Sequence, residues 1–207
     1  MTPLRDLANG LPAVLGGQIL LVACSVFYLI WWTVVFAPDG RTPRPSGALF
    51  LAGAAFAGLG GLVLLVAGII VLLGRSPAST ALTVGGVLVG GILAGAALIA
   101  LTAGPLQRPL TSELPLIVTW ATVQLATCAA LAGAGHLAAP AASGWIAIVL
   151  VATLIGLACY LAYYRLDPVP SYWVGMVPLA VDGLAAGAFG VLVLAGDRLR
   201  ELVLEQP

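Results

Sequence analysis

The chain alternates between long apolar runs and short polar connectors. Six runs, each of about 20 to 27 residues, are long enough for a helix to cross the roughly 30 Å hydrocarbon layer of a bilayer. The connectors concentrate Pro, Gly, Asp and Arg, residues that end helices and favour turns. We therefore predict six membrane-spanning helices, at residues 13–36, 47–73, 81–103, 115–134, 144–164 and 172–195.

The runs are apolar throughout and show no alternation of polar and apolar positions, so they predict helices and not the strands of a membrane barrel. No connector exceeds about a dozen residues, which leaves no room for a soluble domain between spans. The predicted fold is an all-α, polytopic integral membrane bundle, with residues 1–207 as a single membrane domain.

Composition agrees with this interpretation. Hydrophobic residues make up 61% of the chain and charged residues only 8%, against about 25% charged in soluble domains, so the expected surroundings are a lipid bilayer. The eight basic residues are all Arg and are scattered, which excludes a nucleic-acid-binding surface. An Arg-only basic set with abundant Ala and Gly suggests a bacterial protein, and we expect a multi-pass protein of the cytoplasmic membrane.

The charges do not orient the chain. Six spans place four Arg residues on each side of the membrane, so the positive-inside rule gives no answer. The run at 13–36 is longer than the apolar core of a signal peptide, about 7 to 15 residues, and is expected to remain as the first span.

Aromatic residues cluster near the predicted span ends, at the depth where aromatic belts form. We interpret them as interfacial anchors: Trp31, Trp32, Trp145, Tyr163, Tyr164, Tyr172 and Trp173.

Gly and Ala are concentrated inside the spans, where small faces let helix backbones approach closely. Two Gly rows run side by side in the third span, Gly86 with Gly90 and Gly91 with Gly95. They predict either packing within the chain, which we favour, or a seam between two copies.

Asp182 lies near the middle of the last span, where a charged side chain costs about 2.5 to 3.5 kcal/mol or more. Pro178, one turn earlier, lacks an N–H and should kink the helix and free the carbonyl of Val174. Several transporters place an ion or proton site beside such a broken turn. The alternative is a protonated carboxyl that hydrogen-bonds to a neighbouring helix, and the sequence leaves both open.

Other polar residues lie at similar predicted depths. Gln124 is near the centre of the fourth span and Ser25 near the centre of the first, and Gln18 could extend the same lining. We expect these groups to share one level with Asp182. For Gln124 by itself an interhelical hydrogen bond is favoured over a ligand contact.

The sequence predicts no metal site and no cofactor. Cys24, Cys128 and Cys159 lack C-x-x-C spacing and are interpreted as small apolar packing residues. His136 is the only histidine, so no histidine cluster can form. Glu113 reads as part of a helix cap, and no phosphate loop or nucleophile elbow is present.

Three functions are compatible with this pattern. The leading hypothesis is transport or binding of a small molecule or ion, with Asp182 as the responsive group and Gln124, Ser25 and Gln18 as its polar lining. The second is a non-catalytic subunit or scaffold, whose Gly faces pack against a second copy or a partner subunit. The third, a lipid-modifying enzyme, is the less favoured because its acid–base candidates are only Glu113, His136 and Asp167.

Overall fold

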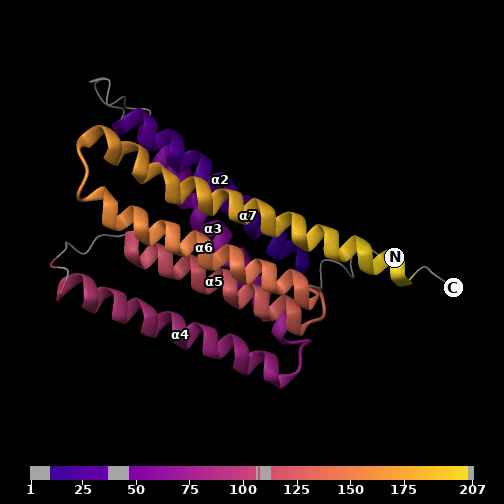
Figure 1. Cartoon of the computed structure of the whole chain (residues 1–207). Coiled ribbons are helices and arrows are strands. Elements are labelled where there is room, and N and C mark those ends of the chain that lie inside the picture. The colour runs from indigo at the N-terminus through magenta and orange to yellow at the C-terminus, as the bar shows by residue number, and fades with distance from the viewer. Residues whose placement is uncertain (1–9, 37–46, 106, 108–112, 205–207) are drawn as a thin grey trace.

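The computed structural model describes residues 10–36, 47–105, 107 and 113–204, with side chains described as far as Ala195. The described residues form helices and short turns (Figure 1). The helices are α2 (Leu11–Phe36), α3 (Gly47–Leu73), α4 (Ala78–Ala103), α5 (Glu113–Gly133), α6 (Ala139–Tyr163) and α7 (Pro168–Leu204). All six are long and apolar enough to cross a membrane, which confirms the predicted fold class.

The observed helix limits differ from the predicted ones mainly where proline is involved. Helix α6 begins at Ala139 and α7 at Pro168, earlier than the predicted starts at 144 and 172. Pro140 and Pro170 occupy the first turns, where a backbone N–H has no partner inside the helix, so they begin helices there and do not break them. At its other end α7 continues to Leu204, so the polar C-terminal segment extends the last helix.

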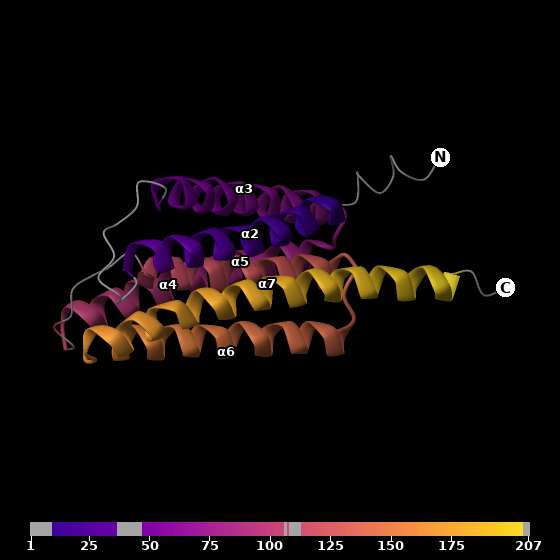
Figure 2. The ribbon, with the colours of Figure 1, turned by 90° about the horizontal axis from the view of Figure 1, so that it is seen from above.

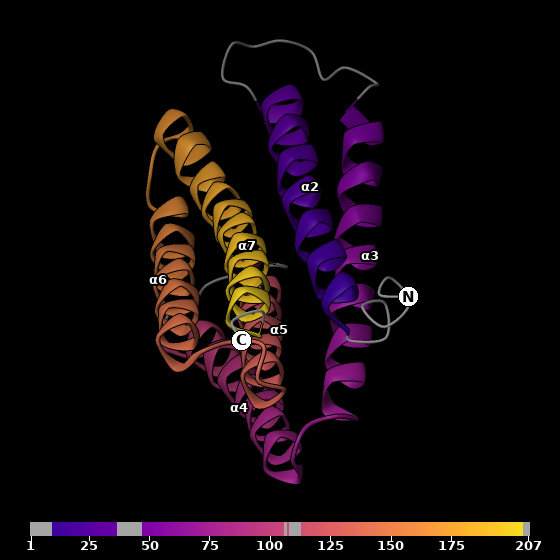
Figure 3. The same ribbon diagram turned by 90° about the vertical axis from the view of Figure 1, so that its right-hand side faces the viewer.

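Five helices form a closed ring. Helix α2 packs on α3, α3 on α5, α5 on α6, α6 on α7, and α7 on α2. Figure 3 shows α2 and α3 on one side of the bundle and α6 and α7 on the other. Helix α4 stands outside the ring and packs mainly on α5, as Figure 1 also shows.

Neighbouring helices in the chain run in opposite directions (Figure 2). We call the end that carries turns 74–77 and 134–138 the first end, and the end that carries turn 164–167 the second end. Helix α2 begins at the first end, and α5 and α7 begin at the second.

The core is concentrated towards the first end. The buried residues of α2 all lie within its first turns, from Leu11 to Gln18. The rings of Trp145 and Phe189 stack there, with centroids 4.1 Å apart and planes within 2° of parallel. Leu65, Leu72, Leu131 and Val149 are among the other fully buried residues of this core.

Trp145 corrects one prediction. From its place near a predicted span end it is expected to be an interfacial anchor, but its side chain is fully buried. Because α6 begins at Ala139, Trp145 lies in the second turn and points into the core against Phe189. Its indole N–H has no hydrogen-bond partner among the described residues.

Small residues bring the ring helices together, as predicted. A Cβ built at Gly61 would come within 3.1 Å of the carbonyl oxygen of Gly17, so α2 and α3 are in close backbone approach. On α4 the two Gly rows differ. Gly91 and Gly95 face Thr122 and Val118 of α5, whereas Gly86 and Gly90 have no atom within 4 Å of a built Cβ.

Candidate functional site

Asp182 lies on the inward face of α7. At about 100° per residue it is about 160° round the helix from Leu184, whose side chain is 75% exposed on the outer surface. It is about 20° from Phe189, which is fully buried in the core. The carboxyl group therefore points into the ring and not towards lipid.

The helix runs on through Pro178 without interruption. Since Pro178 has no N–H, the carbonyl of Val174 has no partner in the helical ladder. Val174 lies one turn before Pro178 and two turns, about 12 Å of axial rise, before Asp182.

Asp182 is half-buried, and its carboxyl has no hydrogen bond or ion pair with any described residue. The two arginines whose side chains the structure describes, Arg75 and Arg165, lie in turns at the two ends of the bundle. An inward carboxyl without a protein partner needs either a proton or an external cation, because an isolated charge is costly in an apolar interior.

Ser25 lies at the level of Asp182. A Cβ built at Gly183 would be 2.8 Å from the Cβ of Ser25 and 3.1 Å from its hydroxyl oxygen, so only glycine fits here without a shift. Ser25 is about 20° round α2 from Gln18 and is also half-buried. The hydroxyl group of Ser25 therefore lies next to Gly183, the residue that follows Asp182.

Gln18 and Gln124 form a reciprocal pair between α2 and α5. Gln18 Nε2 donates to Gln124 Oε1 at 2.8 Å, and Gln124 Nε2 donates to Gln18 Oε1 at 3.0 Å. The side chains are 1% and 0% exposed. Gln124 makes the interhelical hydrogen bond expected of it, and its partner is Gln18, the other amide residue predicted for the site.

The four predicted site residues therefore occupy two levels, not the single level expected from the sequence. A Cβ built at Gly190 would be 4.0 Å from the Cβ of Gln18, whereas Ser25 faces Gly183. Seven residues separate the two contacts on each helix, about 10 Å along the axis. The sequence estimates the depth of a residue only from its distance to the predicted end of its span. The observed helices begin at other residues than predicted, so this estimate cannot resolve a difference of about 10 Å.

The amide level is closed and the carboxyl level is open. Gln18, Gln124, Phe189 and Trp145 are all buried and together fill the ring; we call them the closed layer. Beyond it, towards the second end, every residue of α2 from 19 to 36 and of α7 from 173 to 184 is at least partly exposed. We call this partly exposed part of α2 and α7 the open half.

Trp120 adjoins the closed layer, although no charge in its side chain marks it in the sequence. It lies one turn before Gln124, about 40° away on the same face of α5, and its side chain is half-buried. Its ring is 6.4 Å from that of Phe189, in a stacked arrangement. The signal in the sequence was its spacing from Gln124, which places an aromatic ring at the boundary between the closed layer and the open half.

Aromatic residues surround the second end. Trp32 packs against Gly175, and its indole N–H donates to the carbonyl oxygen of Tyr172 at 3.2 Å. The rings of Tyr163 and Phe36 are 6.3 Å and 4.7 Å from that of Trp32. These contacts join α2, α6 and α7 at the second end of the bundle.

Of the three candidates for lipid chemistry, His136 lies at the opposite end of the bundle from Glu113 and Asp167. Glu113 is exposed at the start of α5 and Asp167 is exposed before α7, whereas His136 lies in a turn at the first end. The residues before Glu113 that would complete the expected helix cap fall outside the described residues.

The three cysteines are free. Cys128 is buried and its thiol approaches the carbonyl oxygen of Ala142 at 3.7 Å, as expected of a packing residue. Within the described part of the chain no group of three His, Cys, Asp or Glu side chains could hold a metal ion.

The architecture is that of a multi-pass helical membrane protein, built as a five-helix ring with a sixth helix outside. Comparison with known protein families, curated proteins and solved structures finds no match. The function must therefore be argued from the site itself.

Proposed function

We propose that this protein binds and transports a small solute or ion, with Asp182 as the group that responds to protons or cations. The observation that carries the proposal is an inward-facing, partly exposed carboxyl without a polar partner among the described residues. A purely structural Asp in a membrane bundle hydrogen-bonds to a neighbouring helix, and Asp182 makes no such bond within the described residues.

Ser25 supplies a hydroxyl at the same level, and Trp120 lies at the edge of the closed layer, where its ring stacks with that of Phe189. Gln18 and Gln124 use their amides on each other, so in this arrangement they close the path towards the first end. Alternating access would require this amide pair to separate, after which both amides would line the path, the role that the sequence predicted. We place the protein in the bacterial cytoplasmic membrane.

The test is solute flux in liposomes that contain the purified protein. Three labelled probes, tetraethylammonium, lactate and glycerol, represent a cation, an anion and a neutral solute, and each is measured with and without a pH gradient. We expect protein-dependent movement of one probe class that responds to the gradient. Asp182→Asn should reduce it at least tenfold, and Asp182→Glu, which keeps the carboxyl, should retain a measurable fraction.

Two results contradict the proposal. One is the absence of protein-dependent flux for all three probes. The other is an Asp182→Asn variant that elutes as a folded protein and moves solute at the wild-type rate, with the same response to the gradient.

A membrane subunit is the second candidate function, and one observation favours it. Helix α4 packs mainly on α5, and its outer row, Gly86 and Gly90, leaves open space for a close helix contact. Copurification of one stoichiometric partner in mild detergent, lost in Gly86→Leu, would support this role.

A further inference from the structure

We infer that protons reach Asp182 from the second end through a relay formed by Glu113 of α5 and Tyr28 of α2. This inference rests on the proposed function and names the proton as the ion to which the site responds. Two observations lead to it. The three side chains lie on the inward faces of three different helices, and the register of these helices places the three groups within a few ångströms of one another in depth.

Tyr28 lies on the inward face of α2. It is about 40° round the helix from Val14, which is fully buried in the core, and about 160° from Val26, which is 49% exposed on the outer surface. Its side chain is half-buried, and its hydroxyl group forms no hydrogen bond with a described residue. A phenol hydroxyl group both donates and accepts hydrogen bonds, so it can pass a proton between two groups.

Glu113 lies on the inward face of α5, at the second end. It is the first residue of the helix, it is exposed, and it is about 20° round the helix from Gln124. Gln124 bonds to Gln18 across the ring, and α5 and α2 run in opposite directions. Glu113 is eleven residues from this pair and Tyr28 is ten, so the two lie at nearly the same depth, at about 1.5 Å per residue. The carboxylate of Glu113 also acts electrostatically on Tyr28, which makes the two side chains neighbours.

Contacts between α2 and α7 give the depth of Asp182. These helices also run in opposite directions, and Ser25 faces Gly183. Asp182 therefore lies about one residue beyond Ser25 towards the second end, and Tyr28 lies two residues, about 3 Å, further. Ser25 and Tyr28 are three residues apart, so their side chains are neighbours on α2, and the hydroxyl group of Ser25 can complete the path to Asp182.

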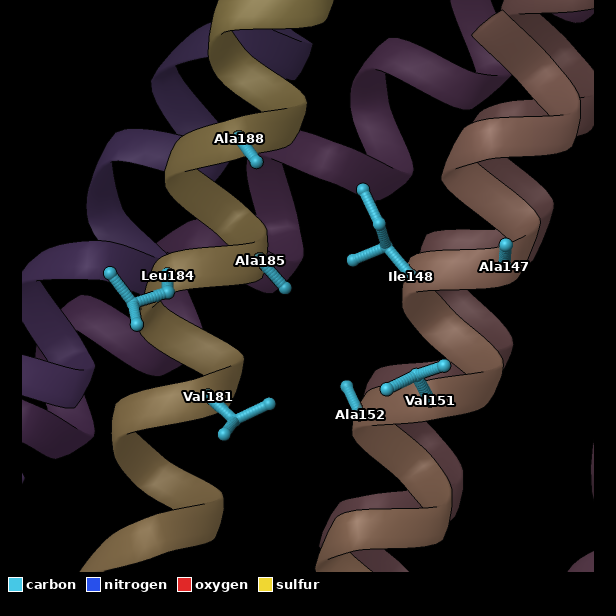
Figure 4. A pocket seen from close by; sticks show the side chains of 8 residues that line it. All are labelled: Ala147, Ile148, Val151, Ala152, Val181, Leu184, Ala185 and Ala188. Carbon is cyan, nitrogen blue, oxygen red and sulfur yellow. The ribbon is translucent and has the colours of Figure 1, made fainter. Parts of the chain in front are cut away.

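The α6 side of Asp182 offers no comparable path. The eight side chains that line the groove between α6 and α7 are all aliphatic (Figure 4). The nearest titratable residue of α6, Cys159, lies two turns beyond Ala152, which is one of these eight. On α2 the thiol of Cys24 packs against Gly58 of α3, on the side away from the ring.

The relay conserves charge at each step. Glu113 takes a proton from water at the second end and passes it to the hydroxyl group of Tyr28, which donates its own proton towards Asp182. Glu113 returns to a carboxylate and Tyr28 is unchanged, whereas Asp182 becomes a neutral acid that needs no counter-ion in the bundle. Chains of ionisable residues are the usual proton paths of membrane pumps and transporters, and water can bridge the gaps between their members.

The experiment measures how fast Asp182 takes up a proton, by infrared spectroscopy of the full-length protein in lipid nanodiscs after a rapid drop in pH. The carbonyl stretching band that Asp182→Asn removes reports the neutral acid. We expect Glu113→Gln and Tyr28→Phe each to slow the rise of this band at least tenfold. The pH at which half of Asp182 is protonated should not change, because a relay alters the rate of protonation and not its equilibrium.

Matched variants control for general effects at the second end. Asp167→Asn removes another exposed carboxyl group at this end, and Tyr163→Phe removes a hydroxyl group from a ring that packs near Trp32. Each should change the rate of protonation less than twofold. Slowing by the control variants as large as that by Glu113→Gln and Tyr28→Phe would contradict the relay.

The outcomes separate this inference from the proposed function. If the band does not respond to pH, or if it rises at the wild-type rate in both relay variants, the relay is wrong, and Asp182-dependent flux in liposomes would leave the transport proposal standing. A band that responds to sodium at constant pH, and not to pH, would show that the site takes a metal cation in place of a proton. If both relay variants slow protonation while no probe moves in liposomes, the relay stands and the transport proposal fails.

Discussion

At the scale of single residues, the reciprocal amide pair is a fully buried polar contact between α2 and α5. Gln18 and Gln124 are 106 positions apart in sequence, and each donates to and accepts from the other. Interhelical hydrogen bonds in membranes contribute about 0.6 kcal/mol on average, but a buried amide left without its partner costs about 1 to 3 kcal/mol. The pair therefore contributes more to the correct alignment of α2 with α5 than to the net stability of the fold.

A double-mutant cycle tests this pair. Gln18→Leu should lower the free energy of unfolding by about 1 to 3 kcal/mol because it leaves the amide of Gln124 buried and unpaired. Gln18→Leu combined with Gln124→Leu should cost less than the sum of the two single changes, since both polar groups are then removed. Unfolding in mixed micelles titrated with dodecyl sulfate gives all three values. Additive single effects would show that the two amides do not interact.

Single residues also show where sequence reasoning reached its limit. The polar character of Asp182, Gln124, Ser25 and Gln18 was visible in otherwise apolar runs. Their partners were not, because a span that is apolar on every side gives no periodic signal of which face is inward. Trp145 shows the same limit, since an error of five residues in a helix start turned a core residue into a predicted anchor.

At the scale of elements, helix length and number followed from the apolar runs, but helix neighbours did not. The sequence predicted that Gly faces pack within the bundle, and the α2–α3 and α2–α7 contacts confirm it. The sequence could not tell which of the two Gly rows of α4 faces α5, because the rows have the same spacing and differ only in the side of the helix on which they lie. The structure turns Gly91 towards Thr122 and leaves Gly90 facing open space.

Adjacent substitutions on α4 should therefore have opposite effects. Gly91→Ala places a methyl group in overlap with the side chain of Thr122 and should destabilise the protein by about 1 to 3 kcal/mol. Gly90→Ala meets no atom and should be neutral or stabilising by up to about 1 kcal/mol, because Ala favours helix. Unfolding in mixed micelles compares the two. Equal stability changes would mean that α4 is rotated relative to the orientation described here.

At the scale of the whole molecule, the ring of five helices divides into a closed layer near the first end and an open half near the second. The closed layer consists of two amides and two stacked rings, and the open half contains Asp182 and Ser25. Along the contact between α2 and α7, a Cβ built at Gly190 would be 4.0 Å from the Cβ of Gln18, whereas at the second end Trp32 packs against Gly175. We expect water to reach the carboxyl group of Asp182 from the second end only.

The most direct test of this account is the accessibility of Ser25 to a charged reagent in lipid vesicles. In a background where the three native cysteines are alanine, single cysteines replace Ser25, Val14 in the core and Val26, which is 49% exposed on the outer surface. A water-soluble trimethylammonium methanethiosulfonate reacts with the thiolate, which forms only where water reaches the sulfur. We expect Ser25→Cys to react at least tenfold faster than Val14→Cys and Val26→Cys. Reaction of Ser25→Cys as slow as that of both controls would show that the interior at the level of Asp182 is dry, and would contradict the account.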